Sequence, residues 1–471
     1  MSTAEIEVRP TLGAVRPRLV LTALMLVIAS FQLQATMLSP ALGDMATRLH
    51  TNGGVIGWSS TVFLAVSAAL AIFFPPLADK IGRRRVLLIS VALMVAGTLI
   101  VLVTSSVLWL MIGRALQGFC GATFALGNLT LRAILDPRKY GFYIALVGAI
   151  NSGVAGFDTL LGGVLVDAAG YKSIFVVILA LEVLALIAVL LWVPETRVAA
   201  AERMDWPGAI TLTLSLWALN MALTFGFGTQ GWGNPWTLAA IIVGLLAAVC
   251  FVLVEKASSN PLVPLAELVQ RSTLGQLGST FFALASAFSV LVFLLPMLSQ
   301  DPINGFGMSG TLSALMYLTP FSLLGWALAP AIGKVAPTIG YRLVLRIGLA
   351  GSSLLIGAML LGLHSRWLLF ALALGMGATW AAASSTCLNA LGVLYASPAR
   401  PGVLPGLNSA AFNMGAGVGI GIMASVLASA SAHQDPTGGY HKALLLGLVM
   451  SLLALGCSLI LPGRENAEEK I

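Results

Sequence analysis

Fourteen stretches of about twenty or more mostly apolar residues run almost end to end through the 471-residue chain. Each stretch is long enough to cross the hydrocarbon core of a bilayer as a helix. Only 9% of the residues are charged, whereas a typical soluble protein carries roughly 25% charged residues. The sequence therefore predicts an all-α polytopic membrane protein.

An even number of spans places both ends of the chain on the same side of the membrane. The predicted spans cover residues 19–42, 54–76, 86–104, 108–130, 141–165, 173–194, 208–226, 235–254, 274–298, 310–332, 343–363, 367–392, 403–431 and 442–461.

The positions of the basic residues test this count, because Lys and Arg concentrate in the cytoplasmic loops of membrane proteins. With both termini inside, twenty of the 25 basic residues lie in cytoplasmic tails and loops, and only Arg48, Lys172, Arg366 and Lys442 lie in outer loops. Adding or removing one span would destroy this split. The sequence thus predicts a multi-pass protein of the cell (inner) membrane with both termini cytoplasmic. The remaining basic residue, Arg114, lies within a span.

Several other classes of protein do not fit the sequence. The four cysteines all lie in apolar runs without C-x-x-C spacing, which argues against a disulfide framework or a zinc site. The excess of basic residues is explained by membrane orientation, so no nucleic-acid partner is expected. No phosphate-binding loop, metal cluster or nucleophile appears at the required spacing. We expect a protein that is not an enzyme and needs no metal or cofactor.

Two short segments resemble signatures of the major facilitator superfamily. The loop after the second span reads Leu-Ala-Asp-Lys-Ile-Gly-Arg-Arg-Arg over residues 77–85, and the fourth span contains Arg-Ala-Leu-Gln-Gly over residues 114–118. The segment from Asp205 to Leu265 is similar to the inserted helix pair of the superfamily's fourteen-span drug:proton antiporter branch.

This resemblance implies a major facilitator fold with 14 transmembrane helices in a 6 + 2 + 6 arrangement. Two six-helix bundles would rock about a binding site near the midplane of the bilayer. Such proteins usually work as monomers. The implied regions are a cytoplasmic tail at 1–18, an N-terminal bundle at 19–197, an inserted pair at 198–272, a C-terminal bundle at 273–462 and a cytoplasmic tail at 463–471.

Two departures from the branch concern the coupling machinery. The branch places an acid in its first span, where this chain has the neutral Gln34. The fifth-span signature contains a Gly-Pro pair where this chain has Asp158 and Thr159. The sequence has therefore lost one carboxylate and gained another.

Ionisable residues within spans are rare because each costs about 2.5–3.5 kcal/mol to insert. Only Asp158, Glu182 and Arg114 lie well inside the predicted spans. A rise of about 1.5 Å per residue puts Arg114 and Asp158 about 10 and 12 Å below the outer face. Because they share a layer, we expect them to pair and to exchange partners as Asp158 takes up a proton. Glu182 is either a further proton-coupling residue or an acid hydrogen-bonded to a neighbouring helix, and Arg114 could instead bind backbone carbonyls permanently.

Polar and aromatic residues within the spans are candidates for the substrate site. Helices that border the central cavity in this superfamily correspond to the spans carrying Gln34, Trp58, Gln300, Trp380 and Asn413. Interhelical hydrogen bonding is the alternative role for each Gln and Asn. Asp79, Arg83 and Arg84, in the loop at the membrane edge, are expected to form a conformational latch.

Three functions stay open at this point. The first is export of small amphipathic or cationic compounds in exchange for protons, with sodium as the alternative coupling ion. The second is transport of one specific metabolite, by symport or as an anionic solute, which the loss of the Gly-Pro pair and of the first-span acid favours. The third, a membrane sensor or scaffold, would need a large soluble domain, and the longest polar segments are only about twenty residues long.

Overall fold

The computed structural model describes residues 6–9, 17–134, 157–198, 205–258, 261, 264–397, 403–433 and 435–462. Within these ranges the chain is helical apart from one two-stranded ribbon and the connecting loops. Thirteen helices of the described part are long and apolar enough to cross a membrane. The fifth predicted span, 141–165, lies partly outside the described residues, and its described part belongs to a helix over 157–169.

The elements of the N-terminal half are β1 Ile6–Arg9, α1 Pro17–Thr36, η1 Ser39–Ala41, α2 Leu42–Arg48, α3 Gly53–Ile81, α4 Arg83–Val103, α5 Val107–Gln117, η2 Gly118–Ala122, α6 Thr123–Ile134, the helix over 157–169, α8 Tyr171–Trp192 and β2 Glu195–Val198. The middle of the chain forms α9 Trp206–Phe227, α10 Pro235–Ala257 and α11 Leu265–Leu268.

The C-terminal half contains several π-helical stretches. Its elements are α12 Arg271–Ala283, η3 Leu284–Phe288, η4 Val290–Leu294, α13 Leu295–Gln300, α14 Gly310–Ser313, η5 Ala314–Leu318, α15 Thr319–Ile339, α16 Tyr341–Leu361, α17 Arg366–Met376, η6 Gly377–Ser384, α18 Ser385–Leu394, α19 Val403–Ala432 and α20 Pro436–Ile460.

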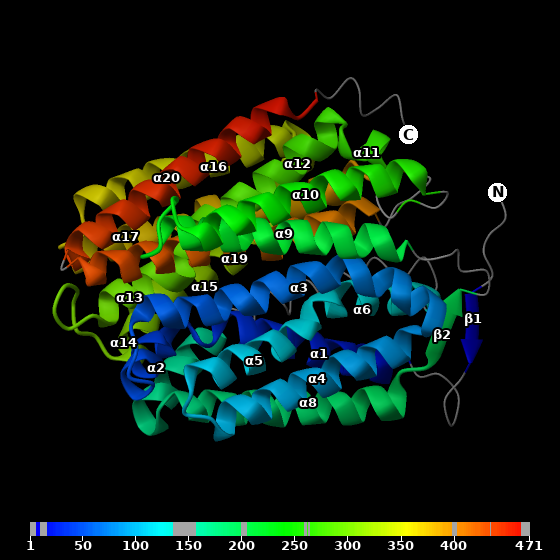
Figure 1. Ribbon diagram of the computed structural model, residues 1–471, viewed down its shortest axis with the longest axis horizontal. Coiled ribbons are helices and arrows are strands. Elements are labelled where there is room, and N and C mark those ends of the chain that lie inside the picture. Colours follow the sequence, from blue (N-terminus) through cyan, green and yellow to red (C-terminus); the bar gives the residue numbers. More distant parts are fainter. Residues whose placement is uncertain are drawn as a thin grey trace.

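The helices run nearly parallel to the long axis of the molecule, with those of the N-terminal half on one side and those of the C-terminal half on the other (Figure 1). Helices α3 and α19 pack against each other where the halves meet, and α9 pairs with α10 and also contacts α19. We call the end where α1 begins and α20 ends the terminal end. The opposite end, with α2, α13 and α14, is the far end.

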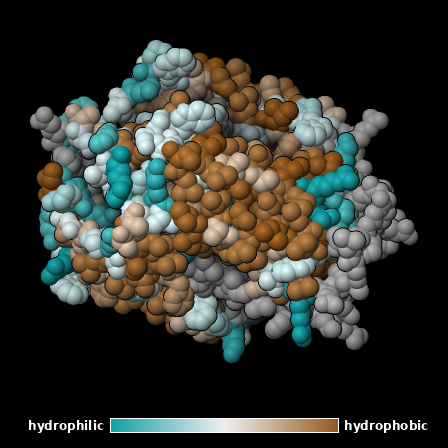
Figure 2. Space-filling model, turned by 90° about the horizontal axis from the view of Figure 1, so that it is seen from below, coloured by the Kyte–Doolittle hydropathy of each residue, from teal (hydrophilic) through white to brown (hydrophobic). Residues whose placement is uncertain are grey.

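On the face shown in Figure 2, a broad hydrophobic area covers the middle of the molecule, and hydrophilic residues gather toward its two ends. Large apolar side chains of α8 and α10, including Leu191, Val176 and Leu253, are more than half exposed. Such a surface would be unstable in water, and it matches the hydrocarbon core of a bilayer.

Helix α19 is the most enclosed of the spans, and its glycines explain why. A Cβ at Gly415 or Gly419 would collide with the backbone carbonyls of Phe281 and Ala285, on one neighbouring helix segment. Gly417 and Gly421 face α3 instead. Glycines two residues apart point to opposite sides of a helix, so α19 can approach both neighbours closely. The run of glycines is therefore a packing motif.

The ribbon at the terminal end was not expected from the sequence. Strands β1 and β2 pair antiparallel, with Glu7 opposite Arg197 and Arg9 opposite Glu195 in the register. Both segments were predicted to be irregular, the first as a tail and the second as a polar break between spans. Apolar and polar residues alternate in β1, which reads Ile-Glu-Val-Arg, but not in β2, which reads Glu-Thr-Arg-Val. Four residues are in any case too few to be distinguished from a loop in advance.

Candidate functional site

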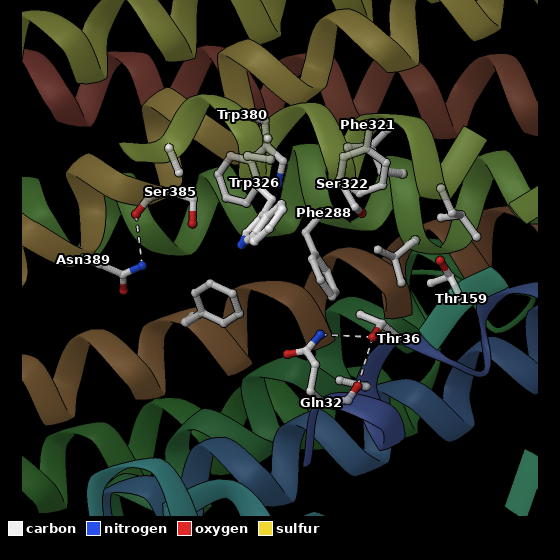
Figure 3. Close-up of a pocket in the computed structure, with 18 of the residues that line it drawn as sticks. Gln32, Thr36, Thr159, Phe288, Phe321, Ser322, Trp326, Trp380, Ser385 and Asn389 are labelled. Carbon is white, nitrogen blue, oxygen red and sulfur yellow. Dashed lines mark hydrogen bonds between the residues drawn. The ribbon is translucent and has the colours of Figure 1, made fainter. Parts of the chain in front are cut away.

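A cavity of about 220 Å³ lies between the two halves. Its walls come from α1, α3, the helix over 157–169, α15, α18, α19 and the π-helical stretches η3, η4, η5 and η6. Such π-helical turns occur frequently at functional sites, because the extra residue in the turn displaces side chains from their helical positions. Figure 3 shows Phe288, Trp326 and Gln32 directed into this space from different helices.

The chemistry of the cavity wall is aromatic and uncharged. Its aromatic members are Phe31, Phe288, Phe321, Trp326, Trp380 and Phe412, and its polar members are Gln32, Thr36, Thr159, Ser322, Ser385, Thr386, Asn389 and Asn413. No ionisable side chain is among the lining residues that the structure describes. The cavity can therefore offer ring stacking and neutral hydrogen bonds, but no direct ion pair.

The structure places two of the five predicted substrate residues, Trp380 and Asn413, in this wall. Gln34 is fully buried elsewhere, and Trp58 donates its ring N–H to Ser425 across the α3–α19 contact at 3.1 Å. Gln300 lies at the far end, next to Gly43. Gln34 and Trp58 therefore join helices in this conformation, which was the alternative role for Gln34, whereas Nε2 of Gln300 has no hydrogen-bond partner among the described residues.

Sequence reasoning did not single out Gln32, Thr36 and Trp326 as site residues. All three line the cavity. A usable signal was present for Gln32 and Thr36, because they are four residues apart in an otherwise apolar span and so share one face of the helix. Trp326 carries no such signal, since an apolar wall residue and a lipid-facing residue look alike in sequence.

Thr36 connects the cavity wall to Asp158. The Thr36 hydroxyl lies within hydrogen-bonding distance of the Asp158 carboxylate and 2.9 Å from the main-chain oxygen of Gln32. The side-chain amide of Gln32 donates to the Thr36 hydroxyl oxygen at 3.0 Å (Figure 3). Asp158 is only 4% exposed, and its Oδ1 atom has no hydrogen-bond partner among the described residues.

Arg114 and Glu182 form a second buried group, which we call the Arg114 cluster, with Gln34, Thr98 and Gln117. Gln34 lies between the two charges, since its Oε1 accepts from Arg114 at 2.9 Å and its Nε2 donates to Glu182 at 2.8 Å. Gln117 accepts from Arg114 and donates to Thr98, both at 2.9 Å. The guanidinium also lies 4.3 Å from the centre of the Phe63 ring, a cation–π contact.

The predicted pair of Arg114 with Asp158 is therefore wrong for this structure, in which Arg114 binds Gln34 and Gln117. The physical reason is the direction of side chains on α1. Gln34 is two residues from both Gln32 and Thr36, about 200° around the helix, so it faces away from them. Depth along the membrane normal, estimated from the rise per residue, does not include this angle, and α1 separates the two charges.

The predicted latch residues form local contacts at the terminal end. Arg83 donates to Asp79 at 2.8 and 3.1 Å and to the carbonyl of Leu129 at 2.7 Å. Arg84 donates to the Leu190 carbonyl at 2.6 Å, and its backbone N–H donates to Glu195 at 3.1 Å. These contacts join the α3–α4 turn to α6 and to the end of α8, all within the N-terminal half.

The far end has a contact between the halves that the sequence did not indicate. The Asp167 carboxylate accepts from the backbone N–H groups of Gly310 and Thr311 at 2.9 and 2.8 Å. Gly163 packs directly on Gly310, where a side chain would collide with its carbonyl. Partial burial raises the pKa of Asp167, but hydrogen bonds from Thr311, Ser309 and Gly310 outweigh it and leave the pKa below its usual value. We call this contact the Asp167 clasp.

Metal binding has no support in the part of the chain that the structure describes. No group of three or more His, Cys, Asp or Glu side chains lies close enough together there to hold an ion.

Two bundles around a central cavity, closed at one end, form the architecture of a rocking transporter. A model of the Major Facilitator Superfamily matches residues 24–301. The chain belongs to this superfamily. It is therefore a multi-pass membrane transporter by family and fold, as the loop and fourth-span signatures indicated.

Two curated relatives differ in what their names describe. The chain is 35% identical over 460 residues, 95% of both chains, to a uridine/deoxyuridine transporter of Lactococcus lactis subsp. cremoris (strain MG1363). It is 28% identical, over 84% of this chain and 73% of the relative, to the multidrug resistance protein Stp of Mycobacterium tuberculosis (strain CDC 1551 / Oshkosh). The structure is similar to a crystal structure of a POT family transporter in complex with 5-aminolevulinic acid, with a TM-score of 0.67 and 15% identity over 94% of this chain and 96% of the other. At that identity the likeness shows the fold alone.

Proposed function

We propose that this transporter carries a neutral nucleoside, such as uridine or deoxyuridine, across the cell membrane by alternating access. The observation that supports this most directly is the cavity wall, which combines aromatic rings with amides and hydroxyls and has no ionisable lining residue among those described. A nucleoside has a flat base that can stack on rings, and a sugar and base edge that exchange neutral hydrogen bonds.

The absence of charge from the described wall argues against the other expected substrates. A cation or anion that leaves water needs an opposite charge to offset its desolvation. Asp158 lies behind Thr36, and Arg114 and Glu182 are held in their own cluster. The cavity volume of about 220 Å³ is also below the roughly 300–1,000 Å³ of typical drug-sized pockets.

The named relatives also favour transport of a specific metabolite over drug export, the two transport functions that the sequence left open. The uridine/deoxyuridine transporter aligns over nearly the whole chain at 35% identity, whereas the multidrug relative aligns over less of it at 28%. A specific metabolite is thus a better proposal than export of amphipathic cations in the fourteen-span drug:proton branch. The drug exporter is kept as the second candidate because of the aromatic wall.

We further propose that protons drive transport, with Asp158 as the coupling residue next to the cavity. In the proposed orientation, with both termini cytoplasmic and two bundles flanking residues 198–272, the far end faces outward. The Asp167 clasp then closes the outer side, so the structure corresponds to an inward-facing conformation. Protons are expected here rather than sodium, because the described cavity wall offers no carboxylate ligand to a metal ion.

Entrance counterflow tests the substrate without requiring knowledge of the driving force or direction. Purified protein in liposomes preloaded with unlabelled uridine should accumulate labelled uridine transiently, and external deoxyuridine should compete. Ethidium should compete poorly. Accumulation blocked by ethidium and insensitive to uridine would instead support the drug exporter, and liposomes without protein provide the background.

A further inference from the structure

The Thr36 hydroxyl has three hydrogen-bonding neighbours, and its single proton can be donated to only one of them. Three atoms surround its oxygen: the Gln32 amide nitrogen, the Gln32 main-chain oxygen and Oδ2 of Asp158. A hydroxyl has one proton to donate and two lone pairs that accept. The amide nitrogen can only donate, so it occupies one lone pair. One donor and one acceptor position are left for two oxygen atoms.

If Asp158 is ionised, both of these oxygens are acceptors, and one of them has no proton between it and Thr36. If Oδ2 carries a proton, every contact is satisfied: Asp158 donates to Thr36, Thr36 donates to the Gln32 main-chain oxygen, and the Gln32 amide donates to Thr36. The arrangement is thus complete only for a protonated carboxyl.

The surroundings of Asp158 agree with this state. Its other oxygen, Oδ1, is buried without a hydrogen-bond partner among the described residues. An unpaired oxygen costs much less free energy on a neutral carboxyl than on a carboxylate. No described cation lies within ion-pair distance, since Arg114 is on the opposite side of α1.

The groups that face Asp158 from the packed helices are few and neutral. From α1 they are the Thr36 hydroxyl and, behind it, the Gln32 amide. About one turn further along the helix over 157–169, Gly162 and Gly163 pack on Met37 and on Gly310, which carry no charge. The next carboxyl on the same helix, Asp167, is nine residues further along and is held in the clasp. Thr36 is thus the described side chain that connects Asp158 to the cavity.

We infer that the Thr36 hydroxyl is the point at which the proton on Asp158 and a hydrogen-bond donor of the substrate compete. When Asp158 loses its proton to water in the cavity, the Thr36 hydroxyl turns its own proton toward the carboxylate. One Thr36 lone pair then becomes free, and a hydroxyl or N–H of the nucleoside can donate to it. When Asp158 is protonated, both lone pairs are occupied. Thr36 is a coupling and specificity residue in this scheme, which rests on the proposed function.

The test compares Thr36→Val, which keeps the shape and removes the hydroxyl, with Thr36→Ser, which keeps the hydroxyl. Thr22→Val is the matched control, because Thr22 is an exposed residue of the same helix whose hydroxyl bonds only the Arg18 carbonyl. Each variant is purified in detergent and checked for monodispersity and melting temperature. Uridine affinity is measured from neutral to mildly acidic pH, with proton release on binding followed by an indicator dye in weak buffer.

In the wild type, we expect the Kd for uridine to rise by about tenfold per pH unit on the acidic side, with close to one proton released per uridine bound. Thr36→Ser and Thr22→Val should retain both properties. Thr36→Val should lose the proton release and bind uridine with a Kd that no longer depends on pH. Wild-type proton release from Thr36→Val would overturn the inference, and so would pH-independent binding by the wild type.

A second readout separates this inference from the proposed function. The carboxyl stretching band of Asp158 in the infrared spectrum, assigned by its loss in Asp158→Asn, reports protonation without any substrate. Thr36→Val should shift this band and its pH midpoint, and Thr36→Ser should not. If the wild type binds no uridine at any pH, the proposed function fails. The band then decides the inference: a shift confined to Thr36→Val supports it, and an unchanged band overturns it.

Discussion

Helix α1 separates two buried polar groups that differ in how many side chains they connect. On one side, the Arg114 cluster links a cation and an anion through Gln34, Gln117 and Thr98, and the cavity is not in contact with these residues. On the other side, Asp158 depends on Thr36 alone among the described side chains that bond it, and Thr36 lines the cavity.

This difference indicates a division of roles. A densely bonded cluster resists change, because breaking any one bond leaves a buried charge without a partner. A carboxyl with one polar neighbour can gain or lose a proton with little rearrangement. We therefore expect the Arg114 cluster to stabilise the N-terminal half and Asp158 to respond to pH. The sequence alone suggested that Arg114 pairs with Asp158, and it left the role of Glu182 open.

The largest effect should come from Arg114→Ala. Arg114 is 1% exposed, and its loss leaves the buried side-chain oxygens of Gln34 and Gln117 without their donor. Removing one member of a buried charged group typically costs about 3 kcal/mol or more. Equilibrium unfolding in mixed micelles measures this, with Arg48→Ala as the control because Arg48 forms an exposed ion pair. Equal stabilities of the two variants would contradict the structural role.

The next effect distinguishes the two acids. Asp158→Asn should remove the pH dependence of uridine binding, a change of about a hundredfold over two pH units. Glu182→Gln should retain that dependence, because Glu182 does not contact the cavity wall. Binding measured across pH on both variants checks this. If Glu182→Gln loses the pH dependence and Asp158→Asn keeps it, the roles assigned to the two groups are reversed.

A smaller effect concerns the cavity wall itself. Trp326→Ala should weaken uridine binding by roughly tenfold, since stacking of a base on an aromatic ring is worth about 1–3 kcal/mol. Trp236→Ala is the matched control, because this exposed tryptophan of α10 is far from the described lining residues in the sequence and is not among them. Titration calorimetry gives both affinities, and identical values would place the nucleoside elsewhere.

The smallest effect should be at the Asp167 clasp, which is largely exposed. Asp167→Asn removes the charge that binds the backbone of Gly310 and Thr311, so the amides of that segment should exchange hydrogen faster. Because hydrogen bonding lowers the pKa of Asp167, the clasp is fully formed above the usual Asp range and is lost as pH falls through the lowered value. Exchange in wild type and variant, compared at the same pH, should differ at neutral pH and converge in acid. A constant difference would contradict this account.

Much of the fold was predictable because membrane insertion constrains sequence strongly. The predicted spans and the three intramembrane charges follow from apolar length and from the cost of burying charge, whereas the signatures at 77–85 and 114–118 come from the resemblance to the superfamily. Thirteen of the fourteen predicted spans correspond to long apolar helices among the described residues. Trp380 and Asn413 could also be placed in the cavity wall, because the resemblance identified which spans border it.

The partners of the charged residues could not be predicted in the same way. Hydropathy and rise per residue predict only the depth of a residue in the membrane. Hydropathy and rise per residue give no rotation of one helix relative to its neighbours, so the replacement of the predicted Arg114–Asp158 pair by two groups on opposite faces of α1 had to come from the structure.

The sequence by itself determined that this chain spans a membrane many times and which superfamily signatures it carries. It also identified the ionisable residues whose insertion into the bilayer costs free energy. The spans and the costly residues depend on composition and apolar length, and the signatures on the resemblance of short motifs to those of the superfamily. All of these are properties of each segment alone. Only the tertiary structure decided that Gln34 bridges Arg114 and Glu182, that Thr36 is the neighbour of Asp158 and that Asp167 joins the two halves. These contacts join residues distant in the chain, and their geometry depends on helix rotation and packing, which no single segment encodes.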